Sequence, residues 1–319
     1  MNAISRILIV IIVVVITCTP AFSVSPTQQK RTKESKTQTI KRRLPMSVAE
    51  AIESVRHSIV QIVVKLEPSQ MQQPGNPIRP IGSGFLISSD GYVITARHVI
   101  NLGPSIPINQ MRVSLPLPII DSKTFSMRGG FTGVAFEVVE QDEQHDLALL
   151  KLQRNPFKNQ VSPGIHVAGE DIKLIVSVPI LNQERPKDGT QIAVSGYPLG
   201  ETVLITNVGY IASSWATNIV NVPIPNAPPG FQRIDVADVY YADVQMNHGN
   251  SGGPVYSIET GDVMGVAVAV RLAEVELEGG GSITTPDNRK LLYNAGIGLV
   301  VPMRYVLDLT RKHGVPVGE

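Results

Sequence analysis

A serine set among glycines is the residue of this chain whose surroundings best suit nucleophilic chemistry. It lies in the stretch Asn247-His248-Gly249-Asn250-Ser251-Gly252-Gly253-Pro254-Val255. Glycine lets the backbone approach a ligand closely and adopt conformations that other residues avoid. The N–H groups of Gly249 and Ser251 can then point at one spot and hold a developing oxyanion beside the attacking hydroxyl. A plain hairpin turn would use the same residues, so the interpretation depends on the rest of the chain.

A general base is the second requirement, because a serine hydroxyl is a poor nucleophile at neutral pH. Among six histidines, His98 directly follows a predicted strand on a short turn, which makes it the candidate base. An ordinary histidine at a strand end is the alternative. His248 is close along the chain to Ser251 and is expected to line the site, whereas His145 is expected to point away from the acid that follows it. The remaining three are typical of surface positions: His57, His166 and His313.

An acid that orients the base is the third requirement. Asp146 stands between the polar run 140–145 and the apolar strand Leu147-Ala148-Leu149-Leu150. A carboxylate at the mouth of a buried strand is desolvated enough to hold an imidazole. Asp142 is the nearest rival, and a role in capping the strand is the purely structural alternative.

The composition fits a globular protein rich in short strands. Of 319 residues, 43% are hydrophobic, which allows a good-sized core in one or two domains. The 24 prolines and 27 glycines favour many short strands over helix bundles. Lys and Arg number 28 against 27 Asp and Glu, so the net charge of +1 gives no reason to expect a nucleic-acid partner. The only cysteine is Cys18, which excludes an intramolecular disulfide.

The first 46 residues predict an export segment followed by a basic linker. Residues 1–23 combine a positive start, the apolar run Ile7 to Ile16 and a small-residue cleavage site ending at Ser23, which is typical of a signal peptide. A membrane anchor is the alternative, because extending the run through residue 22 gives a marginal span. Residues 24–46 are basic and lack aromatic side chains, so we expect a disordered tether. The tether is either simply solvated or associated with anionic membrane lipid.

Strand patterns dominate the rest of the chain and fall into two sets. Short apolar or alternating runs, bounded by turn residues, cover roughly 58–155 and again roughly 186–302. Two such sets predict an all-β fold of two antiparallel β-barrels. The capping box Ser47-Val48-Ala49-Glu50 opens a short N-terminal helix. Residues Met303 to Lys312 predict a C-terminal helix, followed by a tail at 313–319.

Three motifs resemble those of the chymotrypsin-fold serine proteases. They are Thr95-Ala96-Arg97-His98-Val99, His145-Asp146-Leu147-Ala148-Leu149-Leu150 and Gly249-Asn250-Ser251-Gly252-Gly253-Pro254. The order His, Asp, Ser matches that fold and not the subtilisins or α/β-hydrolases. Within it, the chain is most similar to the HtrA/Deg branch, over residues 47–312. The segments that resemble this branch are Gly82-Ser83-Gly84-Phe85, Gly196-Tyr197-Pro198-Leu199-Gly200 and Ile297-Gly298-Leu299-Val300-Val301-Pro302.

The resemblance implies two six-stranded barrels with the site between them and a Ser-His-Asp mechanism. Ser251 would attack a peptide carbonyl, His98 would take and return the proton, and Asp146 would hold the His98 tautomer. The oxyanion hole would be formed by Gly249, Asn250 and Ser251, with the N–H groups of Gly249 and Ser251 as donors. This chemistry requires no metal and no cofactor.

The same resemblance places a substrate pocket beside the nucleophile. Because none of the strand residues in it is charged and the strand is apolar, we expect cleavage after small or medium aliphatic residues. The residues assigned to its walls are Gln245, Met246, His248, Gly265, Val266 and Ala267.

Several features depart from the family pattern. Asn250 replaces the acid that trypsin-type zymogens pair with a new N-terminus, so we expect no such activation. Arg97 puts a cation beside His98 and would lower its pKa, unless the side chain points to solvent. His248 replaces an expected proline. The chain ends at Glu319, so we expect no PDZ-based substrate capture, and an oligomer is possible but unsupported.

Two functional hypotheses follow. The first is an exported endopeptidase that hydrolyses unfolded or misfolded polypeptides in the periplasm or cell envelope, a quality-control role that rests on the resemblance alone. The second is a protease-fold binding or chaperone-like protein with little or no turnover, for which Arg97 and His248 are the only support. Whether Ser251→Ala abolishes hydrolysis separates the two.

Overall fold

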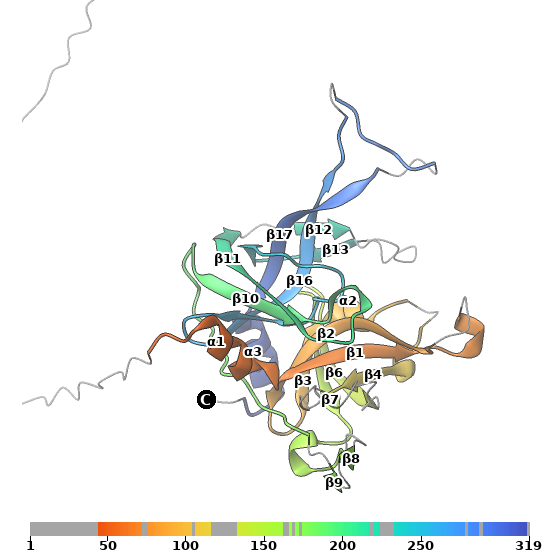
Figure 1. Ribbon diagram of the computed structural model, residues 1–319, viewed down its shortest axis with the longest axis vertical. Helices are drawn as coiled ribbons and strands as arrows, with labels where there is room; N and C mark the ends of the chain where they lie inside the picture. Colours follow the sequence, from red (N-terminus) through yellow and green to blue (C-terminus); the bar gives the residue numbers. More distant parts are fainter. Residues whose placement is uncertain are drawn as a thin grey trace, which may run out of the picture. The chain divides into compact units, whose positions relative to one another are not determined.

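The two sets of strands predicted from the sequence form two separate antiparallel sheets (Figure 1). This computed structural model describes residues 44–71, 76–103, 106–115, 133–161, 166–167, 170–171, 174–216, 220–223, 233–277, 280–286 and 290–317. The predicted export segment and all but the end of the basic linker lie outside these residues. The predicted all-β class is confirmed.

The first sheet has seven strands in the order β5-β4-β1-β2-β3-β7-β6. Its edge strands, β5 and β6, are separated in sequence by Ala135 alone, so the sheet must curl until its edges meet. No ladder joins those edges in the described part of the chain, and the sheet therefore differs from the closed six-stranded barrel that we predicted. Its strands are β1 (Ile59–Lys65), β2 (Ile78–Ser88), β3 (Tyr92–Ala96), β4 (Met111–Ser114), β5 (Gly133–Val134), β6 (Phe136–Asp142) and β7 (Leu147–Leu152).

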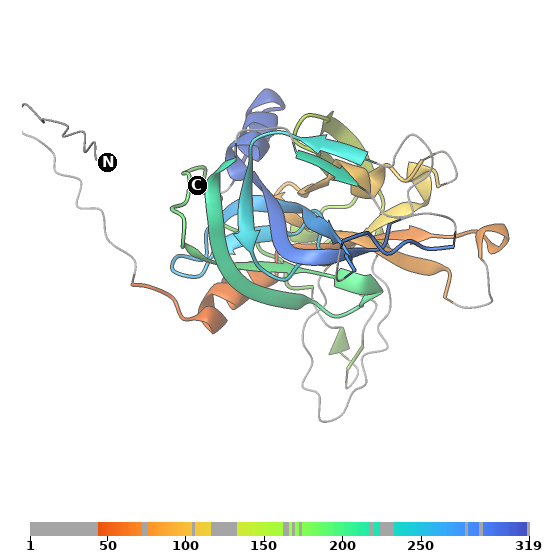
Figure 2. The same cartoon turned by 90° about the horizontal axis from the view of Figure 1, so that it is seen from above.

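The second sheet closes into the predicted six-stranded barrel, in the order β10-β11-β14-β17-β16-β15. In Figure 2, the long strands β11 (green) and β17 (blue) bend around it. Inward side chains such as Val194, Val255 and Val300 are fully buried and form its core. The barrel strands are β10 (Gln191–Gly196), β11 (Ile205–Ala216), β14 (Val239–Asp243), β15 (Pro254–Ser257), β16 (Val263–Glu274) and β17 (Leu292–Pro302). Two small hairpins are β8 (His166–Val167) with β9 (Glu170–Asp171), and β12 (Val220–Pro223) with β13 (Arg233–Val236).

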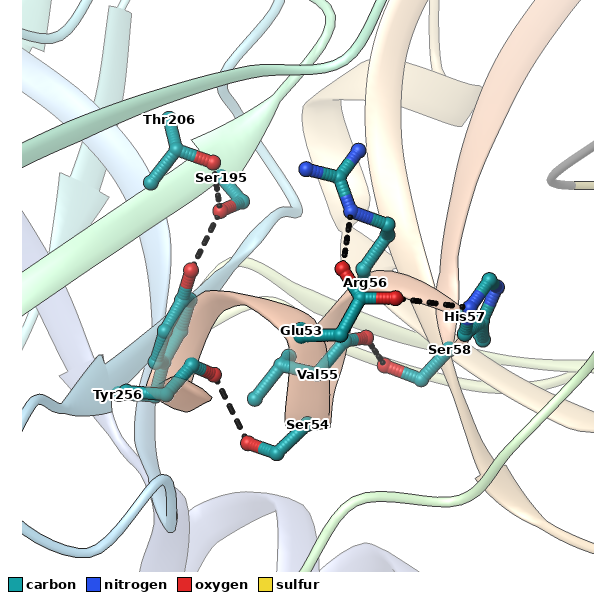
Figure 3. A network of polar contacts seen from close by, with 10 residues as sticks. Glu53, Ser54, Val55, Arg56, His57, Ser58, Ser195, Thr206 and Tyr256 are labelled. Atoms are coloured by element: carbon teal, nitrogen blue, oxygen red, sulfur yellow. Dashed lines mark hydrogen bonds and ion pairs between the residues drawn. The ribbon is translucent and has the colours of Figure 1, made fainter. Parts of the chain in front are cut away.

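The N-terminal helix α1 (Val48–Arg56) begins at the predicted capping box, which is confirmed by the Ser47–Glu50 bonds. The helix packs on the second barrel through Ala51 and Val55, and the Met46 N–H donates to the Glu259 carbonyl at 2.9 Å. Figure 3 shows α1 beside a chain of three hydroxyls contributed by β10, β11 and β15. There the Ser195 hydroxyl lies 2.7 Å from the Thr206 hydroxyl and 2.8 Å from that of Tyr256.

The C-terminal helix α3 has the predicted bounds, Met303–Lys312. It buries Met303, Val306 and Leu309 in the main core, while Lys312 and the following His313 pair with Glu140 of β6. The helix thus fastens the end of the second barrel to the first sheet. The remaining short helices are α2 (Arg97–Ile100), η1 (Pro68–Gln70), η2 (Ile108–Gln110), η3 (Pro156–Lys158) and η4 (Pro198–Gly200). None of the helices in the described residues is long and apolar enough to cross a membrane.

Candidate active site

The pairing of β3 with β7 brings His98 and Asp146 together. Ala96, the last residue of β3, lies opposite Leu147, the first residue of β7. The residues just beyond this pair are therefore neighbours, and the Arg97 N–H donates to the Asp146 carbonyl at 2.9 Å. Four consecutive leucine and alanine side chains at 147–150 are fully buried, which anchors this end of the ladder.

Asp146 holds His98 by two hydrogen bonds. Its Oδ1 accepts the His98 backbone N–H at 2.9 Å, and its Oδ2 lies 2.6 Å from His98 Nδ1. Asp146 is only 2% exposed, so water does not compete for these bonds. Its φ of 54° lies in the left-handed region, where aspartate and asparagine are tolerated best among residues with a Cβ. The contact leaves His98 Nε2 as the free ring nitrogen for a proton transfer.

The pKa of His98 is raised above its ordinary value. Burial opposes protonation of the imidazole, but the charge and hydrogen bond of Asp146 outweigh burial and raise the pKa above 6.5. Arg97 is not among the groups that shift this pKa, which fits the exception that we allowed for a side chain that points to solvent. Arg97 instead pairs with Glu143 at the surface, which directs its charge away from the imidazole.

The raised pKa sets an expected pH dependence. Only neutral His98 can accept a proton, so kcat/KM should rise with pH through one ionisation whose midpoint lies above 6.5.

The contribution of the His98–Asp146 pair to the free energy of unfolding should instead fall as pH rises. Because the folded pKa exceeds the unfolded value, the stabilisation from this pair is complete below pH 6.5 and is lost as pH rises through the folded pKa. Rate profiles and urea melts at a series of pH values measure both, and a kinetic midpoint below 6.5 would contradict the assignment of His98 as base.

Asp142, the rival acid, binds a different histidine. Its Oδ2 lies 2.7 Å from His145 Nδ1, and its Oδ1 accepts the His145 N–H at 3.1 Å. The His145 ring also stacks on Tyr305 of α3, with centroids 3.5 Å apart. His145 thus turns away from Asp146, as we expected, and the rival pair packs between β6 and α3.

In the loop that carries Ser251, every backbone carbonyl from residue 247 to residue 251 accepts a hydrogen bond. The donors and distances are Asn250 N–H to Asn247 (3.0 Å), Leu199 N–H to His248 (2.7 Å), Ser83 Oγ to Gly249 (2.6 Å), Gly253 N–H to Asn250 (2.9 Å) and Ser83 N–H to Ser251 (2.9 Å). By contrast, the N–H groups of Gly249 and Ser251 have no acceptor among the described residues. Because the C=O and N–H of a trans peptide point in opposite directions, the bound carbonyls fix where these two N–H groups point.

Gly249 has to be glycine for this loop to close. Its φ of 102° is unsuited to a residue with a Cβ, and a Cβ there would lie 2.3 Å from the Tyr197 carbonyl oxygen. Asn250, which we included in the oxyanion hole, does not supply a donor, because its N–H is bonded to Asn247. Its side-chain Oδ1 accepts the Asn247 N–H at 2.8 Å, so Asn250 closes the turn.

The Ser251 hydroxyl donates to the Val268 carbonyl at 3.2 Å and makes no hydrogen bond with His98 within the described residues. Catalytic hydrogen bonds are often absent or long before substrate binds. Rotation about one side-chain bond is the step that proton transfer to His98 would need.

Four of the six residues assigned to the substrate pocket are buried. Gly265, Val266 and Ala267 are buried, and Met246 is 1% exposed with its sulfur against Gly298. Met246 and Ala267 pack in the core of the second barrel and Val266 packs in the main core, so their assignment to the walls of a substrate pocket stays a prediction. Gln245 and His248 are exposed. Partial desolvation and the nearby His98 lower the pKa of His248, which favours its neutral form near pH 7.

Sequence reasoning missed two residues that shape the site, Ser83 and Leu199. Both lie in segments that we quoted only for their resemblance to the HtrA/Deg branch. Ser83 is fully buried in β2, and Leu199 holds a left-handed φ of 56° in η4. A serine between two glycines at a strand centre was the available signal, because such a strand has room for another backbone to approach.

Comparison with known proteins identifies the family of this chain. A family model, the trypsin-like peptidase domain, matches residues 82–266. The chain belongs to the trypsin-like peptidase family. Within that family it is HtrA-like, as its curated relatives show. The predicted family resemblance is thereby confirmed.

Two relatives illustrate the range of the similarity. The periplasmic pH-dependent serine endoprotease DegQ of Escherichia coli (strain K12) is 24% identical over 283 residues, covering 83% of this chain and 48% of the relative. A probable periplasmic serine endoprotease DegP-like from Bartonella henselae is 29% identical over 202 residues, covering 62% of this chain and 30% of the relative. This chain thus spans less than half the length of these relatives. The active form of a protease from M. tuberculosis superposes with a TM-score of 0.49 at 21% identity, over 86% of this chain and 91% of that one.

Proposed function

We propose that this protein is a serine endopeptidase in which Ser251 is the nucleophile, His98 the general base and Asp146 the group that orients His98. The observation that carries the proposal is the loop at 247–251, where every carbonyl is bound and the N–H groups of Gly249 and Ser251 are left free. Such a pair of free, oriented donors beside a hydroxyl suits an oxyanion. The Asp146–His98 pair, 2.6 Å apart, supplies the base.

The reaction follows from these positions. Ser251 Oγ adds to the peptide carbonyl carbon while His98 Nε2 takes its proton, and the carbonyl oxygen becomes an oxyanion held by the two N–H groups. The C–N bond then breaks, and His98 gives its proton to the departing amine. Water attacks the acyl-enzyme with His98 again as base, which releases the acid and restores Ser251. Asp146 keeps the Nδ1 proton in place throughout.

Labelling with a fluorophosphonate probe tests the proposal, because the probe reacts with activated serines. Wild-type protein should be labelled and should digest fluorescein-casein, while Ser251→Ala should do neither. An unlabelled wild type that leaves casein intact would refute the proposal.

A binding or chaperone-like protein with little turnover is the second candidate. Two observations favour it: the Ser251 hydroxyl is turned to Val268, and the pocket residues Met246, Val266 and Ala267 are buried. This candidate predicts that wild type suppresses aggregation of an unfolded protein without cleaving it, and that Ser251→Ala does so equally well. Casein cleavage that depends on Ser251 would exclude it.

Unfolded or misfolded polypeptides are the substrates that we propose, with cleavage after small or medium aliphatic residues. The apolar β16 beside Ser251 supports an aliphatic preference, since Val266 to Val270 contains no charge. In a peptide library varied at the residue before the scissile bond, Val, Ala and Ile should outperform Lys and Arg by at least about tenfold, which one favourable apolar contact can provide. A preference for Lys or Arg would contradict this specificity.

Export to the periplasm or cell envelope is also proposed. The apolar run at the N-terminus supports it, as do relatives named periplasmic endoproteases. Fractionation of cells expressing the full chain tests it. Recovery of the protein in the cytoplasm with residues 1–23 intact would refute it.

A further inference from the structure

Ser83 of β2 is bonded to four other groups although it is far in sequence from most of them. Its Oγ donates to the Gly249 carbonyl at 2.6 Å and accepts the Tyr197 N–H at 2.9 Å. Its N–H donates to the Ser251 carbonyl at 2.9 Å, and its own carbonyl accepts the Thr95 hydroxyl at 2.6 Å. A serine hydroxyl has one proton. Since the Tyr197 N–H occupies an acceptor position, that proton is directed to Gly249.

We infer that Ser83 is a positioning residue for the reaction, because it holds the main chain on the C-terminal side of both residues whose N–H groups would bind the oxyanion, Gly249 and Ser251. This inference rests on the proposed function. A peptide plane turns only through its two flanking dihedral angles. The Ser83 hydroxyl holds the peptide plane that follows Gly249, and the Ser83 N–H holds the plane that follows Ser251. Each of the two donor residues is therefore held on its C-terminal side by Ser83.

Gly249 is the residue of the loop that most needs such a restraint. Glycine samples many backbone conformations, and its observed φ of 102° is one of them. Leu199 holds the plane before Gly249 by donating to His248 at 2.7 Å, and Ser83 holds the plane after it. With both planes fixed, the Gly249 N–H keeps one direction before substrate arrives, which is the condition for effective oxyanion stabilisation.

The surroundings of Ser83 are built for close approach. Ser83 and Thr95 are fully buried, so water cannot replace their hydrogen bonds. A Cβ at Gly196 would lie 2.6 Å from Ser83 Oγ, and a Cβ at Gly252 would lie 2.1 Å from the Ser83 carbonyl oxygen. These two glycines therefore allow the second barrel to reach the Ser83 hydroxyl and carbonyl across the joint between the sheets.

Loss of the Ser83 hydroxyl should act on turnover more than on substrate binding. In Ser83→Ala the Gly249 carbonyl and the Tyr197 N–H both lose their partner in a dry site, and the peptide that follows Gly249 keeps only the bond from the Asn250 N–H to Asn247. Misplacement of one oxyanion donor costs about 10² in rate. We expect kcat to fall about 30- to 300-fold with KM changed less than about threefold.

Ser58→Ala is the matched control, since it also removes a fully buried serine hydroxyl that donates to a carbonyl, at 2.7 Å, yet its partner is Val55 of α1. Three quantities are measured for both variants and wild type. Hydrolysis of a tetrapeptide p-nitroanilide ending in valine gives kcat and KM, and urea unfolding gives stability. Binding of a peptide boronate, which forms an anionic adduct on Ser251, reports the affinity of the oxyanion site. Ser83→Ala should lose boronate affinity by the same factor as kcat, and Ser58→Ala should lose stability but keep kcat within about threefold.

The outcomes separate the inference from the proposed function. A wild type without turnover refutes the proposed function. An active wild type with equal loss of kcat in both variants, or with kcat unchanged in Ser83→Ala, refutes the role of Ser83. If Ser83→Ala does not fold, Ser83→Cys takes its place, because a thiol keeps the volume but bonds weakly. That variant should show the same selective loss of kcat and boronate affinity, and unchanged values would refute the inference.

Discussion

Replacing Ser251 by alanine should lower kcat by about 10⁶-fold, the largest effect that we expect for any substitution in this protein. The change removes the attacking oxygen but leaves the five carbonyl contacts of the loop in place, since all of them use main-chain oxygens. Only the 3.2 Å bond from Ser251 Oγ to Val268 is lost. The free energy of unfolding should therefore change by less than about 1 kcal/mol.

The decisive measurement is a comparison with His98→Ala and with the double variant. Because Ser251 and His98 act in one step, each single variant should lose about as much rate as the double variant. Residual hydrolysis in all three should be equal and should come from substrate binding and the two free N–H groups. If the double variant is slower than either single variant by the product of their effects, the two residues do not act as a unit.

Asp146→Asn should lower kcat by about 10⁴-fold with little change in KM. Asparagine suits the left-handed φ of 54° at this position and can still accept the His98 N–H through Oδ1. Its NH₂ group, however, would take the place of Oδ2, which lies 2.6 Å from His98 Nδ1, and would direct a donor at that nitrogen. The imidazole would then carry its proton on Nε2 and could not accept the Ser251 proton. Steady-state kinetics above pH 8, with urea melts to confirm folding, measure the loss.

Asp142→Asn is the matched control for Asp146→Asn. The Asp142–His145 pair has nearly the same geometry, with 2.7 Å between Oδ2 and Nδ1, but faces α3. Its kcat should stay within about threefold of wild type, because surface-side changes away from the reacting atoms rarely act on the transition state. A 10⁴-fold loss in Asp142→Asn together with full activity in Asp146→Asn would reverse the assignment of the acid.

Elements with local signals could be predicted from the sequence to the residue. The capping box at Ser47 and Glu50 marked the start of α1, and the bounds of α3 agree with the apolar pattern of Met303 to Lys312. Such signals depend on neighbours three or four positions away. The two strand sets were also found, because their apolar runs and turn residues are local.

The choice between Asp142 and Asp146 could be proposed but not decided from local pattern. Each aspartate binds the side chain and the N–H of a histidine in this structure. What distinguishes them is the register Ala96↔Leu147, which puts Asp146 beside the end of β3. Register depends on the packing of both strands, which a single stretch of sequence does not contain.

The burial of the pocket residues in β16 reflects what covers the two faces of that strand. Val266 and Val268 pack in the main core and Ala267 packs in the core of the second barrel, so all three side chains are at 1% exposure or less. An apolar run is consistent with a strand covered on both faces, but it does not identify what covers each face.

The distance in sequence between the parts of the site has a consequence for how the protein acquires activity. Ser83 and Gly249 are 166 residues apart, and His98 and Asp146 are 48 apart. Contacts that close such long loops form late in folding, since their entropic cost is met only when many other contacts form with them. A nascent or refolding chain should thus be inert as a protease until the two sheets dock, and fluorophosphonate labelling in a refolding time course should lag behind the circular dichroism of the strands. A chain that is still folding would thereby be protected from digestion by its own neighbours.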